Sequence, residues 1–295
     1  MSYLRAALLV LGLAVQQPFT ADPVIRAEKT YFEAVRARDV PLPKARPGEW
    51  RHDHPEPEQT FAQYRQSLMP GADSARRTIY LQPLGSFTPL QQRALRETRR
   101  YLAAFFQTPV VLQPARTPFV PAHTRRRLGK GPEQVLASYL LESQLKGQLP
   151  PDALALMAFS PQDLYPRPDW NYVFGLASYP DRVGITSLYR LQGGTLTPDN
   201  FARGLARLIN LSSHEIGHML LLQHCLRARC AMNGTNSLAE TDATPNRFCA
   251  ECQAKLYLRR RYDNRQRLRE LTTFFQDHGL RRDYQLARQD ARGLK

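Results

Sequence analysis

One short segment of the chain carries side chains whose types and spacing suit metal chemistry. His214 and His218 are four positions apart, and Glu215 follows the first of them. Residues i and i+4 lie on one face of an α-helix, so both imidazoles can bind one metal ion, while Glu215 beside them can act as general base toward a water molecule. The spacing predicts a zinc hydrolase site, although the same short motif also arises by chance in unrelated helices.

A third histidine, His224, follows six residues after His218. On a continuous helix it would point about 120° away from the ligand face, so it reaches the metal only if the helix ends near residue 221 and the chain turns back. Three imidazole ligands leave the fourth tetrahedral position open, as a catalytic zinc requires. We therefore expect His214, His218 and His224 to bind a catalytic zinc ion and Glu215 to be the catalytic base.

All cysteines of the chain lie in the window that follows: Cys225, Cys230, Cys249 and Cys252. Two close pairs separated by a loop are the usual arrangement of a structural zinc bound by four thiolates. Two disulfides are the alternative, but C-x2-C disulfides are strained, and a secreted disulfide framework would not crowd into one window. We expect a second, structural Zn2+ here. Because Cys225 follows His224, this zinc would fix the loop that carries the third histidine.

The combined pattern resembles the archaemetzincins, a branch of the metzincin zinc peptidases. It runs from His214 to Cys225, continues through the remaining cysteines with Met232 between the pairs, and includes segments 163–167, 170–175 and 233–236. The resemblance spans roughly residues 76–256, with a weaker similarity to the animal-type members at 48–50 and 54–56. It implies a zinc-dependent metallopeptidase that hydrolyses peptide bonds of a peptide or protein substrate, with aminopeptidase-type action as one form of that activity.

One residue departs from the family pattern. Three residues after the second histidine the family has Gly, and this chain has Leu221. In metzincins that Gly ends the helix with a positive φ, a conformation that costs a leucine about 1–2 kcal/mol. The turn that delivers His224 must therefore form differently, or at a cost that the cysteine zinc offsets. Met232, beside an Asn-Gly turn, is expected to form an apolar floor beneath the zinc; filling an ordinary core gap is the alternative.

Hydrophobic periodicity predicts strands that alternate with helices. Strands are expected at 79–81, 109–112, 153–159, 171–177 and 183–189, and helices at 89–106, 132–145, from 197 to about 221, and beyond Cys252 to about Phe275. This predicts an α/β (α+β) fold: a metzincin-like twisted mixed sheet, a long active-site helix and a zinc-clamped C-terminal subdomain. We place its antiparallel edge strand at 183–189, where an extended peptide can pair with residues 184–187.

Four regions follow from this pattern: residues 1–21, an N-terminal extension over 22–75, a metzincin-like catalytic domain over 76–256 and a basic C-terminal helical region over 257–295. The extension is expected to be a cap, a lid or a segment wrapped on the domain. Its His52 and His54 could form a metal-binding pair, but solvated loop residues are the favoured interpretation.

The first 21 residues resemble a secretory signal peptide, because Arg5 precedes an apolar run from Ala6 to Val15 that is too short to span a membrane. Cleavage is expected after Ala14 or Ala21, while a hydrophobic N-terminal helix or a misplaced start codon is the alternative. Secretion or a periplasmic location is slightly favoured. A cytoplasmic location is the alternative, because four cysteine thiolates bind zinc more easily in a reducing compartment.

The chain has 295 residues, with 41 Lys and Arg against 26 Asp and Glu, so its formal net charge is +15. Such a balance favours anionic partners. The arginine runs at 125–127 and 259–261 lack interleaved aromatic residues and any nucleic-acid fold signature, so we expect a basic soluble surface and no specific nucleic-acid partner. No transmembrane segment is expected, and the sequence sets no oligomeric state. The alternative function is a catalytically weak or inactive zinc-binding interaction protein for an anionic partner.

Overall fold

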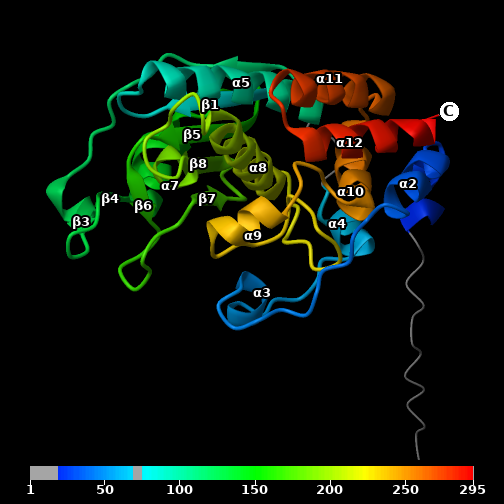
Figure 1. Cartoon of the computed structure of the whole chain (residues 1–295), viewed down its shortest axis with the longest axis horizontal. Coiled ribbons are helices and arrows are strands. Elements are labelled where there is room, and N and C mark those ends of the chain that lie inside the picture. The colour runs from blue at the N-terminus through cyan, green and yellow to red at the C-terminus, as the bar shows by residue number, and fades with distance from the viewer. Residues whose placement is uncertain (1–18, 69–74, 295) are drawn as a thin grey trace, which may run out of the picture.

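The computed structural model describes residues 19–68 and 75–294, and its centre is a five-stranded mixed sheet (Figure 1). The strand order is β2-β1-β5-β8-β7. Four strands run parallel: β1 (Thr78–Pro83), β2 (Val110–Leu112), β5 (Ala153–Ser160) and β8 (Val183–Ser187). The fifth, β7 (Gly175–Ser178), is antiparallel to β8. The predicted mixed sheet with an antiparallel edge strand is confirmed.

The identity of the edge strand, however, was wrong. Ile185 of β8 pairs with Ala158 of β5 on one side and with Leu176 of β7 on the other, so both sides of the β8 backbone are occupied. The free edge is β7, the earlier arm of the same hairpin. Local periodicity identifies the hairpin but not its outer arm, because β8 is covered by a strand more than 20 residues away.

Helices cover one face of this sheet. Helices α5 (Pro89–Phe106) and α8 (Phe201–Met219) pack against each other and against the strands (Figure 1). The start of α5 agrees with the prediction because Thr88 and Gln91 form a capping box ahead of an apolar stripe. Every residue of β5 is buried. Met157 and Phe159 join the core on the α5 and α8 side, which is why its sequence is continuously apolar.

The opposite face is covered by a segment that differs from the prediction. A helix was expected over 132–145, but Glu133–Leu136 forms strand β4, and helical turns follow only in α6 (Ala137–Tyr139), η3 (Leu140–Leu145) and η4 (Lys146–Gln148). Strand β4 joins β3 (Arg125–Arg127) and β6 (Asp163–Tyr165) in a second, three-stranded sheet. Pairing with these strands outweighs the helix-start signal of Pro132 and Glu133.

The C-terminal region is a set of helices rather than the single helix expected beyond Cys252. It contains α10 (Ala250–Arg260), α11 (Asn264–Asp277), α12 (Arg281–Ala291) and the short η5 (Arg292–Leu294). The first break falls at Arg261, which has a φ of 50°, and Asp263 then caps α11. Helix α11 packs on α5, where the rings of Tyr101 and Phe274 lie 5.5 Å apart.

The N-terminal segment wraps around this body. It forms η1 (Phe19–Ala21), α1 (Pro23–Arg26), α2 (Lys29–Arg36), α3 (Trp50–Asp53) and α4 (Phe61–Ser67). Helices α2 and α4 pack against α10, with the rings of Phe32 and Tyr257 5.6 Å apart. In Figure 1, α3 lies away from these helices, below α9 (Leu238–Ala243). Helix α7 (Leu188–Leu191) follows β8.

The proposed signal peptide falls almost entirely on residues 1–18, which lie outside the described residues. Of the remaining three, Phe19 is buried against Phe32, with the two rings 6.1 Å apart. Cleavage after Ala21 would therefore remove a core contact. Among the residues that the structure describes, no helix combines the length and apolar character needed to cross a membrane.

Candidate metal centre and active-site cleft

The helix that carries the first two histidines ends where the third one requires it. Helix α8 stops at Met219, and Leu221 takes a φ of 71°. The amide of Leu222 then donates to the carbonyl of Gly217 at 3.0 Å, so the chain folds back along the helix end. Leu221 thus adopts the left-handed conformation that the family pattern assigns to glycine, and the expected turn forms without it.

This turn brings the three histidines together. The ring centroids of His214 and His218 are 4.4 Å apart, and that of His224 lies 5.2 Å and 4.8 Å from them. One nitrogen of each ring lies within 4.8 Å of the other two, and the Nε2 atoms of His214 and His218 are 2.9 Å apart. Three imidazoles that share one point are a suitable donor set for zinc.

The outward nitrogen of each ring has an oxygen partner that can only accept a hydrogen bond. The Nδ1 atoms donate to the carbonyl of Ala231 (2.8 Å from His214), the carbonyl of Leu222 (2.7 Å from His218) and the carboxylate of Glu56 (2.7 Å from His224). Each proton therefore sits on Nδ1, and each Nε2 keeps its lone pair. Such outer hydrogen bonds fix the tautomer and orientation of metal-binding histidines.

Burial also keeps two of these imidazoles neutral. It lowers the pKa of His214 to about 3 and the pKa of His218 well below its ordinary value. A protonated imidazole cannot bind a metal, so the buried pocket favours the ligand form.

Glu215 lies beside this histidine group and under the edge strand. Its side chain is buried, and burial raises its pKa to about 8. Gly175 of β7 provides the space: a Cβ added there would lie 2.5 Å from Glu215 Oε1. The carboxyl group lines the same cleft as the three imidazoles. It is therefore placed where a general base of a hydrolytic site is needed.

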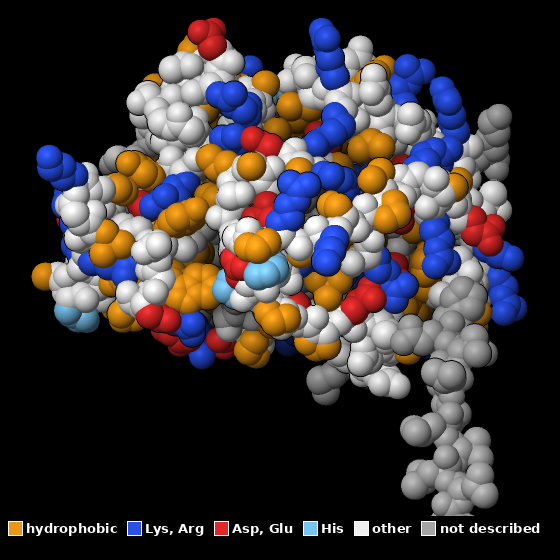
Figure 2. All heavy atoms as spheres, turned by 60° about the horizontal axis from the view of Figure 1, so that its bottom comes forward, with side chains coloured by type: hydrophobic (Ala, Val, Ile, Leu, Met, Phe, Trp, Pro, Cys, Tyr) orange, Lys and Arg blue, Asp and Glu red, His pale blue; other side chains and the backbone are white. Residues whose placement is uncertain are grey.

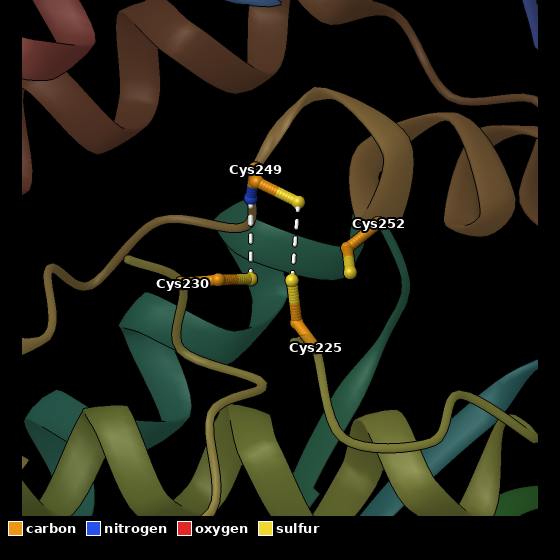
Figure 3. A group of neighbouring side chains, drawn as sticks. All are labelled: Cys225, Cys230, Cys249 and Cys252. Carbon is orange, nitrogen blue, oxygen red and sulfur yellow. Dashed lines mark hydrogen bonds between the residues drawn. The ribbon is translucent and has the colours of Figure 1, made fainter. Parts of the chain in front are cut away.

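The four cysteines form a second group (Figure 3). Cys225 and Cys230 come from the loop after α8, Cys249 caps α10 and Cys252 lies in its first turn, with the side chains pointing toward one another. None forms a disulfide, and the four sulfurs lie within 4.8 Å of one another. The sulfurs of Cys225 and Cys249 are 3.6 Å apart. Zinc–sulfur bonds of about 2.3 Å in a tetrahedron place sulfurs about 3.8 Å apart, so the spacing fits four thiolates around zinc.

The two groups share one loop. Cys225 directly follows His224, and its amide donates to the carbonyl of Met232 at 2.8 Å. Ala231, which holds His214, lies between Cys230 and Met232. Met232 packs beneath α8, because a Cβ on Gly217 would lie 2.4 Å from its sulfur. Met232 is thus a buried floor under the histidine helix, and the cysteine loop positions two of the three imidazoles.

The histidines open into a cleft of about 780 Å³. Its walls come from β7, from the loop over residues 166–173 and from the N-terminal segment. His54 from that segment stacks on Trp170, with ring centroids 5.2 Å apart, and Trp50 packs on His224 at 5.1 Å. His54 therefore lines the cleft, while the exposed His52 does not. Neither belongs to the metal-binding groups found among the described residues.

Sequence patterns alone missed several cleft residues. Among them are Trp50, Gly175 and Tyr179, whose hydroxyl lies 2.9 Å from His218 Nδ1. Glu56 does not line the cleft but accepts a hydrogen bond from His224, and it was missed as well. Trp50 and Glu56 lie in the weak N-terminal similarity at residues 48–50 and 54–56, and Gly175 lies in the matched segment 170–175, but neither similarity shows which side chains meet. These side chains come from segments distant in sequence, so their meeting in space follows from the fold.

Comparisons with known proteins agree with this geometry. A family model described as Peptidase family M54 matches residues 141–258. Archaemetzincin-2 of Rattus norvegicus is 31% identical over 244 residues, which are 70% of this chain and 67% of that protein. Archaemetzincin-2 of Macaca fascicularis is 29% identical over 257 residues, or 73% and 69% of the two chains. The crystal structure of archaemetzincin from Methanopyrus kandleri has a TM-score of 0.51 at 24% identity, covering 65% of this chain and 98% of that one, and shows the same fold.

Together the similarity and the histidine group define the class: the chain is a zinc metallopeptidase, a hydrolase that acts on peptide bonds. Within that class the chain belongs to the archaemetzincin family, as its sequence pattern predicted.

Proposed function

We propose that this cleft hydrolyses peptide bonds with His214, His218 and His224 as ligands of a catalytic zinc and Glu215 as general base. Cys225, Cys230, Cys249 and Cys252 hold a second, structural zinc. The observation that carries the proposal is the set of Nδ1 hydrogen bonds, which leaves three Nε2 lone pairs facing one point beside Glu215. The open cleft next to that point gives a substrate access.

A zinc ion in this cage supplies a Lewis acid that polarises the scissile carbonyl and acidifies water. The protein's own residues supply the proton transfers. Glu215 accepts the proton of the attacking water and delivers it to the leaving amine, a role open to a carboxylate buried beside the three imidazoles. The backbone of β7, free on its outer edge and lining the cleft through Leu176 and Ala177, pairs with an extended peptide.

Within this activity we propose aminopeptidase-type action. Asp169 lines the cleft together with the stacked rings of His54 and Trp170. Its carboxylate pairs with Arg167 at 3.0 Å, and a substrate ammonium group would compete with that partner. A carboxylate beside aromatic faces suits the free ammonium group at the start of a peptide. A comparison of one peptide with its N-acetylated form tests this point. We expect loss of cleavage on acetylation, and equal rates would exclude aminopeptidase action.

The alternative, an inactive zinc-binding interaction protein, depended on a degraded turn at Leu221. That turn forms, and it delivers His224. On the face in Figure 2, Lys and Arg are dispersed among hydrophobic and uncharged side chains. Absence of a specific nucleic-acid partner stays a prediction.

The substitution Glu215→Gln tests the proposal. It keeps the shape of the side chain and removes its basicity, so turnover of a peptide substrate should fall about 10²- to 10⁴-fold while zinc content stays unchanged. Glu142→Gln, at an exposed carboxylate outside the cleft, is the matched control and should keep full activity. Wild-type turnover in Glu215→Gln would remove Glu215 from the mechanism. An interaction protein would instead be indifferent to this change, and its affinity for an anionic partner would fall steeply with salt.

A further inference from the structure

His224 is held by Glu56, a residue of the N-terminal segment that lies 168 positions earlier in the chain. Glu56 accepts a hydrogen bond from His224 Nδ1 at 2.7 Å, and the same carboxylate oxygen accepts another from Trp50 Nε1 at 3.0 Å. The indole of Trp50 packs edge-on against His224, with ring centroids 5.1 Å apart. Two residues of the N-terminal segment thus fix the rotation of this imidazole. The other two histidines are oriented by backbone carbonyls close to the active-site helix.

The same segment also holds the turn that leads to His224. The side-chain amide of Gln59 donates to the carbonyl of Leu221 at 2.9 Å, and its oxygen accepts from the amide of Gln223 at 3.3 Å. Gln59 therefore bridges Leu222, the residue after the left-handed one, by binding the carbonyl that precedes it and the amide that follows it. Tyr64 adds a third contact, donating its hydroxyl to the carbonyl of Leu220 at 3.1 Å. Gln59, Tyr64 and Leu220 are buried and Leu221 is partly buried, while Gln223 is exposed.

The N-terminal segment is itself anchored to the helix that carries two of the cysteines. The ammonium group of the buried Lys255 donates to the backbone carbonyl of Gln59. Lys255 lies three residues after Cys252 on α10. Gln59 is therefore fixed by the cysteine subdomain at its backbone and grips the histidine turn with its side chain.

Leu221 explains why such a support is needed. A left-handed conformation is unfavourable for leucine and easily adopted by glycine. Its φ of 71° therefore persists because the surrounding contacts hold it. Gln59 and Tyr64 make those contacts. Gln59 binds the carbonyl of Leu221 and the amide of Gln223, and Tyr64 binds the carbonyl of Leu220.

We propose that three side chains of the N-terminal segment, Glu56, Gln59 and Tyr64, form a built-in clamp that completes the catalytic metal site. Glu56 is the positioning residue for His224, and Gln59 is the support that replaces the missing turn glycine. The proposal rests on the proposed function, since it takes His224 to be a zinc ligand. In this proposal the N-terminal segment supports metal binding and does not merely cover the domain.

Zinc affinity of the full-length protein tests the role of Glu56. Zinc is removed from the histidine site by a graded chelator series, and the metal left on the protein is counted. Glu56→Gln should lower the affinity of that site about 10- to 100-fold, the usual effect of losing an outer hydrogen-bond partner of a metal-binding histidine, and leave the cysteine zinc in place. The matched control is Glu58→Gln. Glu58 is two residues away and pairs with Arg227 instead of a histidine, so its substitution should keep wild-type affinity.

The role of Gln59 is tested by a double-mutant cycle with Leu221. Gln59→Ala should weaken the histidine zinc in the same assay because the strained turn loses two hydrogen bonds. Leu221→Gly removes the need for this support, so Gln59→Ala with Leu221→Gly should recover most of the lost affinity. A purely structural role of Gln59 in packing would show no such rescue.

The outcomes separate the clamp from the function on which it rests. Unchanged zinc affinity in both Glu56→Gln and Gln59→Ala, with a wild type that binds zinc and is active, would overturn the clamp alone. Equal losses in Glu56→Gln and Glu58→Gln would also overturn it, since the effect would then reflect general loosening. A wild type that holds zinc only at the cysteines would overturn the three-histidine site itself and the clamp with it.

Discussion

The close approach of Gly175 to Glu215 gives the sharpest prediction about catalysis. A Cβ at position 175 would lie 2.5 Å from Glu215 Oε1, 3.0 Å from its Cδ and 3.1 Å from its Cγ. Ordinary contacts begin at 3.4 Å, so in Gly175→Ala the carboxylate must retreat by about 0.9 Å. The clash involves the outer atoms of a side chain, so Glu215 moves and the strand stays.

A displacement of about 1 Å in a catalytic group can cost about 100-fold in rate, equivalent to about 2.7 kcal/mol in the activation barrier. We expect kcat of Gly175→Ala to fall by about that factor, with zinc content unchanged because no histidine moves. The assay is steady-state cleavage of a fluorogenic peptide, combined with metal analysis of the same preparation.

Gly147→Ala is the matched control, because a Cβ there meets nothing within 4 Å and the site is remote from the cleft. It should keep wild-type kcat. Full activity of Gly175→Ala with both metals bound would refute the placement of Glu215 under the edge strand. Loss of zinc together with activity would show that the histidine group, and not the base, had been disturbed.

Three further predictions concern the framework of the site. In Gly217→Ala the new methyl group would meet the Met232 sulfur at 2.4 Å, and this overpacking should destabilise the protein by about 1–3 kcal/mol in urea unfolding; a wild-type midpoint would contradict the Met232 floor. In Arg190→Met the fully buried carboxylate of Asp163 loses its bidentate guanidinium partner, whose two hydrogen bonds are 2.7 and 2.8 Å long. The free energy of unfolding should fall by about 3 kcal/mol in the same urea experiment, and a fall of less than about 1 kcal/mol would refute the importance of the pair. Chelation that empties the cysteine site, beyond the level that empties the histidine site and stops peptide cleavage, should lower the melting temperature further, because the cysteines lie in the core; a melting temperature unchanged in this second step would contradict a structural zinc at the cysteines.

Local signals in the sequence predicted the elements that depend on neighbouring residues. The capping box at Thr88 gave the start of α5, and the spacing of His214 and His218 placed both on one helix face. The continuously apolar run over 153–159 identified a strand buried on both sides. The alternation of strands and helices predicted the mixed sheet, and the family resemblance, carried by the histidine and cysteine pattern, predicted the class of enzyme.

Features that depend on remote pairing escaped prediction. Pro132 and Glu133 suggest a helix start, yet Glu133–Leu136 is a strand because Val135 pairs with Leu164 in β6. The outer arm of the hairpin was misplaced because β8 is covered by β5. Glu56 lies 168 positions from His224, and no pattern in either segment shows that the two side chains meet. Leu221 takes the positive φ that the family pattern assigns to glycine, but the residues that hold the turn became visible only in three dimensions.

Zinc counting in the purified full-length protein tests the central claim most directly. We expect two zinc ions per chain in the wild type and about one in His224→Ala, because that substitution removes a ligand of the histidine site and leaves the four thiolates. A wild type with a single tightly bound zinc and oxidised cysteines would contradict the account, as would a His224→Ala variant that retains both ions at wild-type affinity.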